Sequence, residues 1–236
     1  MKKILLLFVI TITFAQVNGQ TTVFHNLLQK HVTEDGVVDY KSFNKDISKL
    51  ESYISYLART SPEDSWSENK QKAFWINAYN AYTIQKILKN YPLKSIMNIK
   101  ENGETAWKIP FAKVGEKTYT LDHIEHEILR KNLFDPRIHV GVNCASRSCP
   151  KLGNVAFTEE NVEPILEKLM KEFVNDETRN KVSKNNVKIS SIFDWFKNDF
   201  SKESTIIEYL NKYATVKINK NASIEYLKYD WSLNGK

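Results

Sequence analysis

The chain has 236 residues, of which 42% are hydrophobic and 12% aromatic. This composition excludes a disordered chain and is typical of a globular protein large enough to bury one real core. The formal net charge is +6, but the lysines are spread along the chain without a dense basic block. The charge therefore indicates a solvated surface and argues against binding to nucleic acid.

The N-terminal segment has the pattern of an export signal. A basic pair at residues 2–3 precedes an apolar run at residues 4–15, which is much shorter than the roughly 20 residues that a membrane span requires. We expect residues 1–19 to be a signal peptide, cleaved before Gln20, and residues 20–236 to form a single domain in the periplasm or outside the cell. The alternative is a permanent N-terminal anchor. No other stretch is apolar enough to cross a bilayer.

The remaining sequence predicts an α+β fold, mainly helical, in a single domain around a small sheet of short strands. Helical periodicity and alternating apolar residues define the elements, and no repeat or Gly/Pro-rich linker divides them. The expected helices span residues 22–32, 42–59, 68–90, 121–131, 158–175 and 203–213. The expected strands span residues 37–40, 107–114, 117–120, 138–144, 187–190 and 224–233.

Two asparagines interrupt the apolar face of the expected helix 68–90. Asn77 and Asn80 both lie within the arc of buried-looking residues, where an amide competes for backbone hydrogen bonds and is unfavourable. Buried amides most often tie loops or strand edges to a helix. We therefore expect both to form a scaffold beneath any site.

The expected helix 121–131 carries Glu125 inside its apolar arc. A buried carboxylate must be paired or capped, because burying a lone charge is costly. One interpretation is a capping box, in which Asp122 is the N-cap residue and Glu125 reaches back to its amide. His126 and Arg130 share the flank beside this arc. Together with Glu125 they bind an anion or orient a catalytic group, or they form an ordinary solvated flank.

The segment at residues 139–150 holds both cysteines and one of the five histidines. In a regular strand, His139 and Asn143 share one face and Cys144 points to the other, so His139 pairs with Cys144 only across a bulge. Cys149, beyond the turn, is free to return over His139. Because the connection from the preceding helix is short, we expect Glu125 or His126 to approach His139.

The two cysteines are close enough in sequence to bridge across a turn. An exported chain favours a disulfide between Cys144 and Cys149, although closing so short a loop contributes only ~2 kcal/mol. The sequence has no H-E-x-x-H, no Cys-x-x-Cys, no G-x-S-x-G and no phosphate or dinucleotide loop. We therefore predict no metal and no cofactor.

Four segments together resemble the family called domain of unknown function 547. They are residues 74–81, 121–130, 139–150 and 229–234, in the right order over most of the mature chain. The resemblance implies no established activity. Bacterial members are often exported, and intracellular plant members resemble the pattern with serines near the cysteine positions, which fits a disulfide better than an obligatory thiol nucleophile. Family members often carry an arginine or tyrosine soon after Pro150, where this chain has Lys-Leu-Gly-Asn.

Three functions fit these observations. The first is binding of a small molecule, peptide or envelope component in a polar cleft outside the cytoplasm. The cleft would be lined by Glu125, His126, Arg130, His139 and Asn143 and supported by Asn77, Asn80 and Asp230. The second is a hydrolase or acyl transferase, with Cys149 as nucleophile, His139 or His126 as base and Glu125 beside them. The third is a purely structural network of buried polar groups.

Overall fold

The computed structural model describes residues 19–235. The predicted signal peptide therefore lies outside the described residues, apart from Gly19 at its end. Residues 19–31 are helical, which matches the expected helix 22–32 with an earlier start. The chain then turns at Gly36, whose φ of 78° suits a residue without a side chain. The expected strand at residues 37–40 is reduced to two isolated bridges of Val38, one with Val32 and one with Gly235.

The expected helix 42–59 is divided at its beginning. It consists of α2 (Tyr40–Phe43), a 3-10 turn, η1 (Asn44–Asp46), and α3 (Ile47–Arg59). The Asp39 carboxylate caps α2 by accepting the amide N–H of Ser42. Helix α3 then presents an apolar face, including Leu50 and Leu57, to the next helix.

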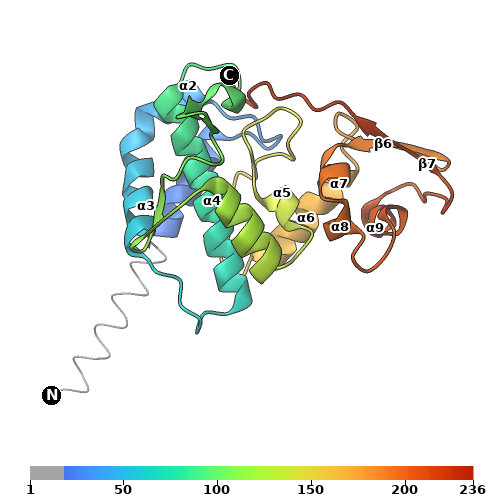
Figure 1. The fold of residues 1–236 in the computed structure, drawn as a ribbon, viewed down its shortest axis with the longest axis horizontal. Coiled ribbons are helices and arrows are strands. Elements are labelled where there is room, and N and C mark those ends of the chain that lie inside the picture. The colour runs from blue at the N-terminus through green and yellow to red at the C-terminus, as the bar shows by residue number, and fades with distance from the viewer. Residues whose placement is uncertain (1–18, 236) are drawn as a thin grey trace.

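Helix α4 (Glu68–Asn90) runs through the centre of the molecule (Figure 1) and has the bounds that the sequence predicts. Ser67 caps it by accepting the amide N–H of Lys70. Every residue from 72 to 88 is buried, because α3, the helix at residues 123–132 and α6 pack around it. A helix buried on all sides explains why polar residues such as Asn77 and Asn80 are found in the core.

Within residues 19–235 the strands form three small sheets instead of the single sheet expected. Two are antiparallel hairpins, which pair β1 (Lys100–Glu101) with β2 (Glu104–Thr105) and β3 (Ala112–Val114) with β4 (Lys117–Tyr119). The third has the order β5 (Lys181–Val182), β6 (Asn186–Ser190), β7 (Ser223–Leu227), antiparallel and then parallel. The α+β fold class is confirmed.

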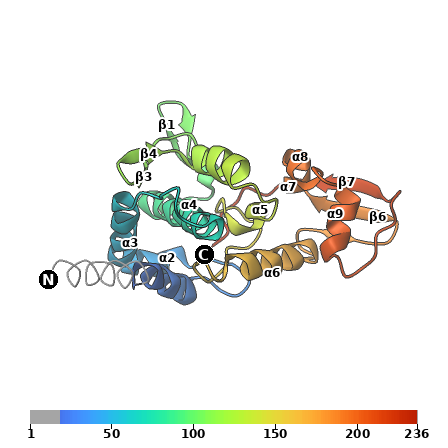
Figure 2. The same cartoon turned by 90° about the horizontal axis from the view of Figure 1, so that it is seen from below.

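The C-terminal elements form a separate lobe beyond the end of α6 (Val162–Val174) (Figure 2). The lobe holds the third sheet with α7 (Ile192–Trp195), α8 (Lys197–Phe200) and α9 (Ile206–Tyr213). A capping box of Thr205 and Glu208 starts α9, which lies within the helix predicted at residues 203–213.

The C-terminal tail returns from this lobe to the first half of the molecule (Figure 1). The amide of Leu233 donates to the Lys94 carbonyl at 2.8 Å, and that of Asn234 to the Ala145 carbonyl at 3.1 Å. The strand expected at residues 224–233 therefore ends at Leu227, because the tail pairs with separate loops and not with one neighbouring strand. This return carries the tail aromatic residues across the middle of the protein.

The strand expected at residues 138–144 is wrong. Residues 138–141 form a short helix, α5 (Ile138–Gly141), packed against α6. A β-carbon at Gly141 would lie 2.9 Å from Leu166 Cδ2, so a larger residue at this position would require the Leu166 side chain to shift. The alternation of valines indicated burial correctly. However, the Asn80 side chain, not a neighbouring strand, satisfies the Gly141 carbonyl.

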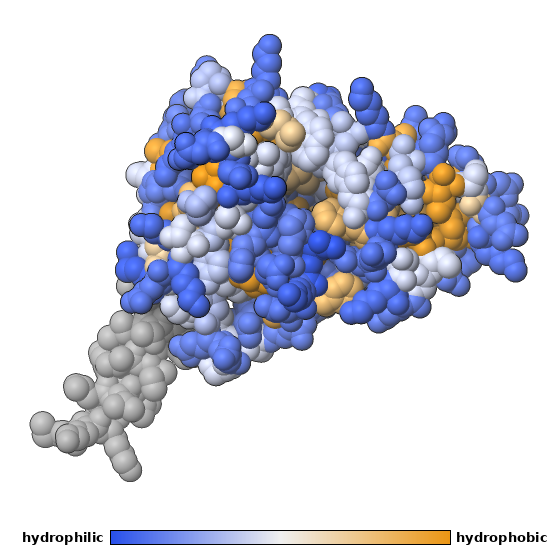
Figure 3. Space-filling view, viewed as in Figure 1, coloured by the Kyte–Doolittle hydropathy of each residue, from blue (hydrophilic) through white to orange (hydrophobic). Residues whose placement is uncertain are grey.

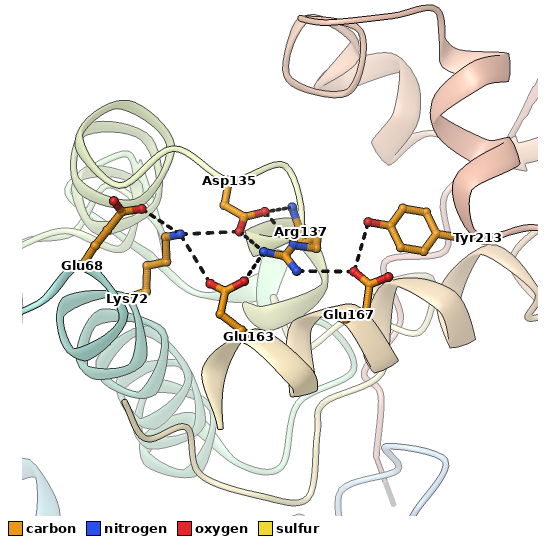
Figure 4. A network of polar contacts seen from close by, with 7 residues as sticks. All are labelled: Glu68, Lys72, Asp135, Arg137, Glu163, Glu167 and Tyr213. Carbon is orange, nitrogen blue, oxygen red and sulfur yellow. Dashed lines mark hydrogen bonds and ion pairs between the residues drawn. The ribbon is translucent and has the colours of Figure 1, made fainter. Parts of the chain in front are cut away.

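A partly buried ion-pair network joins α4 to α5 and α6 (Figure 4). Arg137 binds Asp135 through two nitrogens, at 3.0 and 2.7 Å, and reaches Glu163 at 2.5 Å. Lys72 of α4, only 6% exposed, contacts the same two carboxylates at 3.5 and 3.7 Å. Such a network positions the start of α5 relative to two long helices. Movement of one partner would leave the other charges without a compensating ion pair, which costs free energy.

The visible surface is mostly hydrophilic, with small apolar patches (Figure 3). One of these patches lies over the C-terminal lobe. Within residues 19–235, the longest and most apolar helices still fall short of what a membrane crossing requires.

Candidate functional site

A cavity of about 190 Å³ lies where the two halves of the protein meet. Its walls come from α4, the helix at residues 123–132, α5, the cysteine segment, α7 and the C-terminal tail. The residues that line it are Tyr79, Trp107, Asp122, Glu125, His126, His139, Val142, Cys144, Cys149, Ile192, Trp195, Phe196, Tyr229 and Trp231. The structure thus brings together half of the ten predicted site residues, namely Glu125, His126, His139, Cys144 and Cys149, and adds a set of aromatic side chains to them.

The expected scaffold role of the asparagines is confirmed by their hydrogen bonds. Asn77 donates to the Phe157 carbonyl at 2.7 Å and accepts from the Phe157 amide at 2.9 Å. Asn80 donates to the Gly141 carbonyl and accepts from the Asn143 amide, both at 2.8 Å. Each amide replaces a missing strand partner for a buried loop. Neither side chain lines the cavity.

Asn143 shapes the cysteine turn from within and also stays outside the cavity lining. Its side chain donates to the Pro150 carbonyl at 2.8 Å and accepts from the Ala145 amide at 2.9 Å and from the Asn234 side chain at 3.0 Å. Ala145 has a φ of 59°, a left-handed conformation that is costly for any residue with a β-carbon. The turn between the two cysteines is therefore held in shape by amide hydrogen bonds.

The two cysteines are free thiols in this structure, and the disulfide between them stays a prediction. The Cys144 amide N–H donates to Cys149 Sγ at 3.2 Å. Cys144 Sγ lies 3.0 Å from Ser146 Oγ and 3.3 Å from the Tyr229 hydroxyl. The cysteines are neighbours across a turn, as their spacing predicts.

The two thiols differ in their electrostatic surroundings. Hydrogen bonding from Cys149 lowers the pKa of the Cys144 thiol to about 7, against the effect of burial, with help from Ser146 and Tyr229. Burial raises the pKa of Cys149 well above its usual range. Cys144 is therefore the thiol that more readily carries a negative charge, whereas the sequence analysis assigned the nucleophile to Cys149.

Glu125 is buried, with 9% of its surface exposed. It lies beside the Tyr79 hydroxyl, whose pKa is raised by burial and by this carboxylate. The capping-box interpretation is wrong, because Asp122 makes no side-chain cap hydrogen bond. The segment is a π-helix, η3 (His123–Asn132), a rare geometry that is frequent at functional sites.

His139 is 3% exposed and has a carboxylate partner that the sequence analysis missed. Its Nε2 lies 2.8 Å from Asp199 Oδ2, and Arg130 binds both oxygens of Asp199 at 2.7 and 3.0 Å. Arg130 also donates to His126 Nδ1 at 3.1 Å. His126 and His139 are thus linked through the ion pair of Arg130 and Asp199, while Glu125 lies beside Tyr79.

Asp199 is ionised by its partners. Burial raises the pKa of this carboxyl, but the hydrogen bonds from His139 and Arg130 outweigh burial and hold the pKa below its usual range. The ring of His139 also stacks on Phe196, with 4.0 Å between ring centroids. In the sequence Asp199 lies between the partly buried Phe196 and the buried Phe200, and this spacing was the one available signal that the carboxylate lies close to the core.

Aromatic side chains form the outer part of the cavity. Trp195 stacks on Trp231 with centroids 5.8 Å apart, and Tyr229 lies 4.6 Å from Trp231. Trp107 meets Trp231 edge-on at 5.7 Å. Asp230, expected to support the cleft, is exposed and accepts the Ser232 amide instead. The tail therefore contributes its aromatic residues to the cavity and its aspartate to a local turn.

Chemically, the cavity combines carboxylates, imidazoles and thiols with aromatic walls. No cluster of three or more histidine, cysteine, aspartate or glutamate residues arranged for a metal ion is found within residues 19–235. Arg130, predicted as a cleft residue, is taken up by Asp199 and His126 and is not part of the lining.

Comparison with known proteins places the core of the site in a family. Residues 63–174 match the family described as "Protein of unknown function, DUF547". This stretch contains α4, η3, α5 and both cysteines, whereas the aromatic tail that resembled the family lies outside the match. No curated protein and no solved structure matches the chain. Residues 63–174 of this chain thus match the family that the sequence resembles, DUF547, whose function is unknown.

Proposed function

We propose that this protein binds a small organic cation in the aromatic cavity, outside the cytoplasm. The observation that carries the proposal is the chemistry of the lining. Asp122 and Glu125 contribute carboxylates and six aromatic side chains form walls, while no lysine or arginine occurs among the described residues that line it. Aromatic faces combined with a carboxylate are the arrangement that recognises ammonium groups.

The energetics of Glu125 support this ligand class. A buried carboxylate is costly unless an opposite charge or several hydrogen bonds compensate it. The Tyr79 hydroxyl lies beside it, and within residues 19–235 no ion pair involves Glu125. A bound cation would supply the missing charge in a place already shielded from water.

The volume sets an upper limit on the ligand. About 190 Å³ is below the roughly 300–1,000 Å³ of pockets for drug-sized molecules. A compact ammonium compound, or the ammonium end of a longer chain, matches this space. A folded partner or a bulky polymer would have to be recognised through a single ammonium group that protrudes into the cavity.

Tryptophan fluorescence offers a direct test, since Trp107, Trp195 and Trp231 line the cavity. We expect choline or tetramethylammonium to change the emission saturably. Glu125→Gln should weaken this binding at least about tenfold, whereas Glu127→Gln, an exposed carboxylate on the same helix, should leave it unchanged. Equal weakening by both substitutions, or no saturable change with either cation, would contradict the proposal.

Export is the second part of the proposal and rests on the sequence of residues 1–19. Expression of the full chain in a bacterial host, with fractionation, should place a shortened protein outside the cytoplasm, with its N-terminus near Gln20. Replacing the basic pair at residues 2–3 with glutamate should retain the full chain in the cytoplasm. Recovery of uncleaved wild-type protein in the cytoplasm would refute export.

The hydrolase or acyl-transferase alternative stays a prediction. Such an enzyme needs a base within hydrogen-bond reach of its nucleophile. Within residues 19–235 no hydrogen bond joins either thiol to a histidine, and His139 Nε2 is directed at Asp199. The hydrogen-bond neighbours of the thiols are instead Ser146, Tyr229 and the amide of Cys144.

A further inference from the structure

The two cysteines occupy one wall of the cavity without being bonded to each other. We infer that Cys144 and Cys149 form a redox-active dithiol that exchanges with small thiols and disulfides entering the cavity, with Cys144 as the attacking thiol and Cys149 as the resolving one. The inference stands on the geometry of the turn and does not depend on whether the cavity binds a cation.

The turn gives the thiols unequal positions. Cys144 is half-buried and contacts Ser146 Oγ and the Tyr229 hydroxyl, at 3.0 and 3.3 Å. Cys149 is 4% exposed, and its sulfur accepts the Cys144 amide N–H. An incoming disulfide therefore contacts Cys144 first, because the Cys149 sulfur is more deeply buried.

The surrounding hydrogen bonds stabilise a negative charge on the outer sulfur. The Cys149 thiol, Ser146 and Tyr229 lower the pKa of Cys144, while burial keeps Cys149 protonated. Thiolate is the form that attacks a disulfide, and a thiol whose pKa lies near the ambient pH attacks most efficiently. The asymmetry thus supports the order of reaction that the positions indicate.

The fold does not need a bond between these sulfurs. The Arg147 amide donates to the Ser232 carbonyl at 2.7 Å, and Arg179 Nε donates to the Cys149 carbonyl at 2.7 Å. Asn143 ties both ends of the turn together. Because closing so short a loop adds only ~2 kcal/mol, oxidation and reduction can interconvert without unfolding the site.

The reaction balances as two successive exchanges. The Cys144 thiolate attacks one sulfur of a small disulfide, forms a mixed disulfide and releases one thiolate. Cys149 loses its proton to solvent and attacks Cys144 Sγ, which forms the Cys144–Cys149 bond and releases the second thiolate. Two protein thiols are oxidised and the disulfide substrate gains both electrons. A dithiol compound reverses the sequence.

The experiment uses the reduced protein, freed of reductant, with oxidised glutathione as the probe and intact mass as the readout. Wild type should lose the mass of two hydrogen atoms, and dithiothreitol should restore it in the folded state. Cys149→Ser should accumulate a mixed disulfide with one glutathione on Cys144. Cys144→Ser should react at least about tenfold more slowly, because the buried thiol is mostly protonated.

Several results would overturn the inference. They are a preferred mixed disulfide on Cys149, equal reactivity of the two single variants, or a wild-type bond that resists dithiothreitol until the protein is denatured, which would identify a structural disulfide. Mapping the first glutathione adduct in wild-type protein by peptide mass keeps the test valid even if a variant folds poorly. Thermal melting of both variants checks their folding.

Discussion

His139 Nε2 and Asp199 Oδ2 lie 2.8 Å apart, although 60 residues separate them in the chain. This contact joins α5, which precedes the cysteine turn, to α8 in the C-terminal lobe. Arg130 of η3 binds the same carboxylate, so Asp199 connects α8 to η3 and α5, two elements that line the cavity. The shape of the cavity therefore depends on one aspartate that does not line it.

Removal of that aspartate should be costly. Asp199→Ala leaves His139 and Arg130 without their shared partner, and we expect the free energy of unfolding to fall by about 3 kcal/mol, the scale for breaking a largely buried ion pair. Urea denaturation measures the change. Asp194→Ala, at an exposed carboxylate in α7, is the matched control and should stay within about 0.5 kcal/mol of wild type. Equal losses in the two variants would contradict the role of Asp199.

The lowered pKa of Asp199 leads us to expect that the fold is less stable at acid pH. Its pKa is lower in the folded protein than in the unfolded chain, so its contribution is complete above the unfolded value of about 4 and declines as the pH falls below it. The stability difference between wild type and Asp199→Ala should therefore be largest near neutral pH and shrink below about pH 4. A difference that grows on acidification would show the opposite linkage.

Close packing at α5 gives an independent prediction. Gly141→Ala places a β-carbon 2.9 Å from Leu166 Cδ2 and 3.2 Å from Ile76 Cδ1, and overpacking of this kind costs about 1–3 kcal/mol. Gly153→Ala is the control, because its β-carbon would lie 3.7 Å from its nearest neighbour, Leu169 Cδ1. Thermal unfolding should separate the two variants clearly. An unchanged melting temperature for Gly141→Ala would mean that α5 has more room than the structure shows.

Alkylation by iodoacetamide should distinguish the two thiols in the folded, reduced protein. With the pKa of Cys144 lowered to about 7 and that of Cys149 raised, modification of Cys144 should rise steeply through neutral pH, because the thiolate is the reactive form. Cys149 should become modified only after denaturation. Peptide mass spectrometry locates the adduct. Faster modification of Cys149 in the native state would reverse the assignment of the two cysteines.

Sequence patterns predicted the helices with long amphipathic or capped segments well. Helix α4 has the predicted bounds, because Ser67 caps its start and Pro92 follows its end. The strand predicted at residues 138–144 was wrong, since alternating valines indicate burial but do not show which group hydrogen-bonds to the backbone. Here the Asn80 side chain does so, a partner 61 residues away.

The candidate site was predictable in part for a similar reason. Glu125, His126, His139 and both cysteines line the cavity as expected. Asp199 and Trp195 were missed, because their contacts with η3, α5 and the cavity depend on how the C-terminal lobe packs against the first half of the chain. The two asparagines of α4 were correctly identified as scaffold, since an amide on an apolar face has few other stable roles.

The most direct test of the proposed function compares two ligands of nearly equal shape by isothermal titration calorimetry of the wild-type protein. One is choline, and the other is its neutral analogue, in which a tert-butyl group replaces the trimethylammonium group. If the carboxylate and aromatic walls recognise positive charge, choline should bind at least about tenfold more tightly, a difference of about 1.4 kcal/mol. Equal affinity for the two compounds, or heat from neither, would contradict a cation-binding cavity.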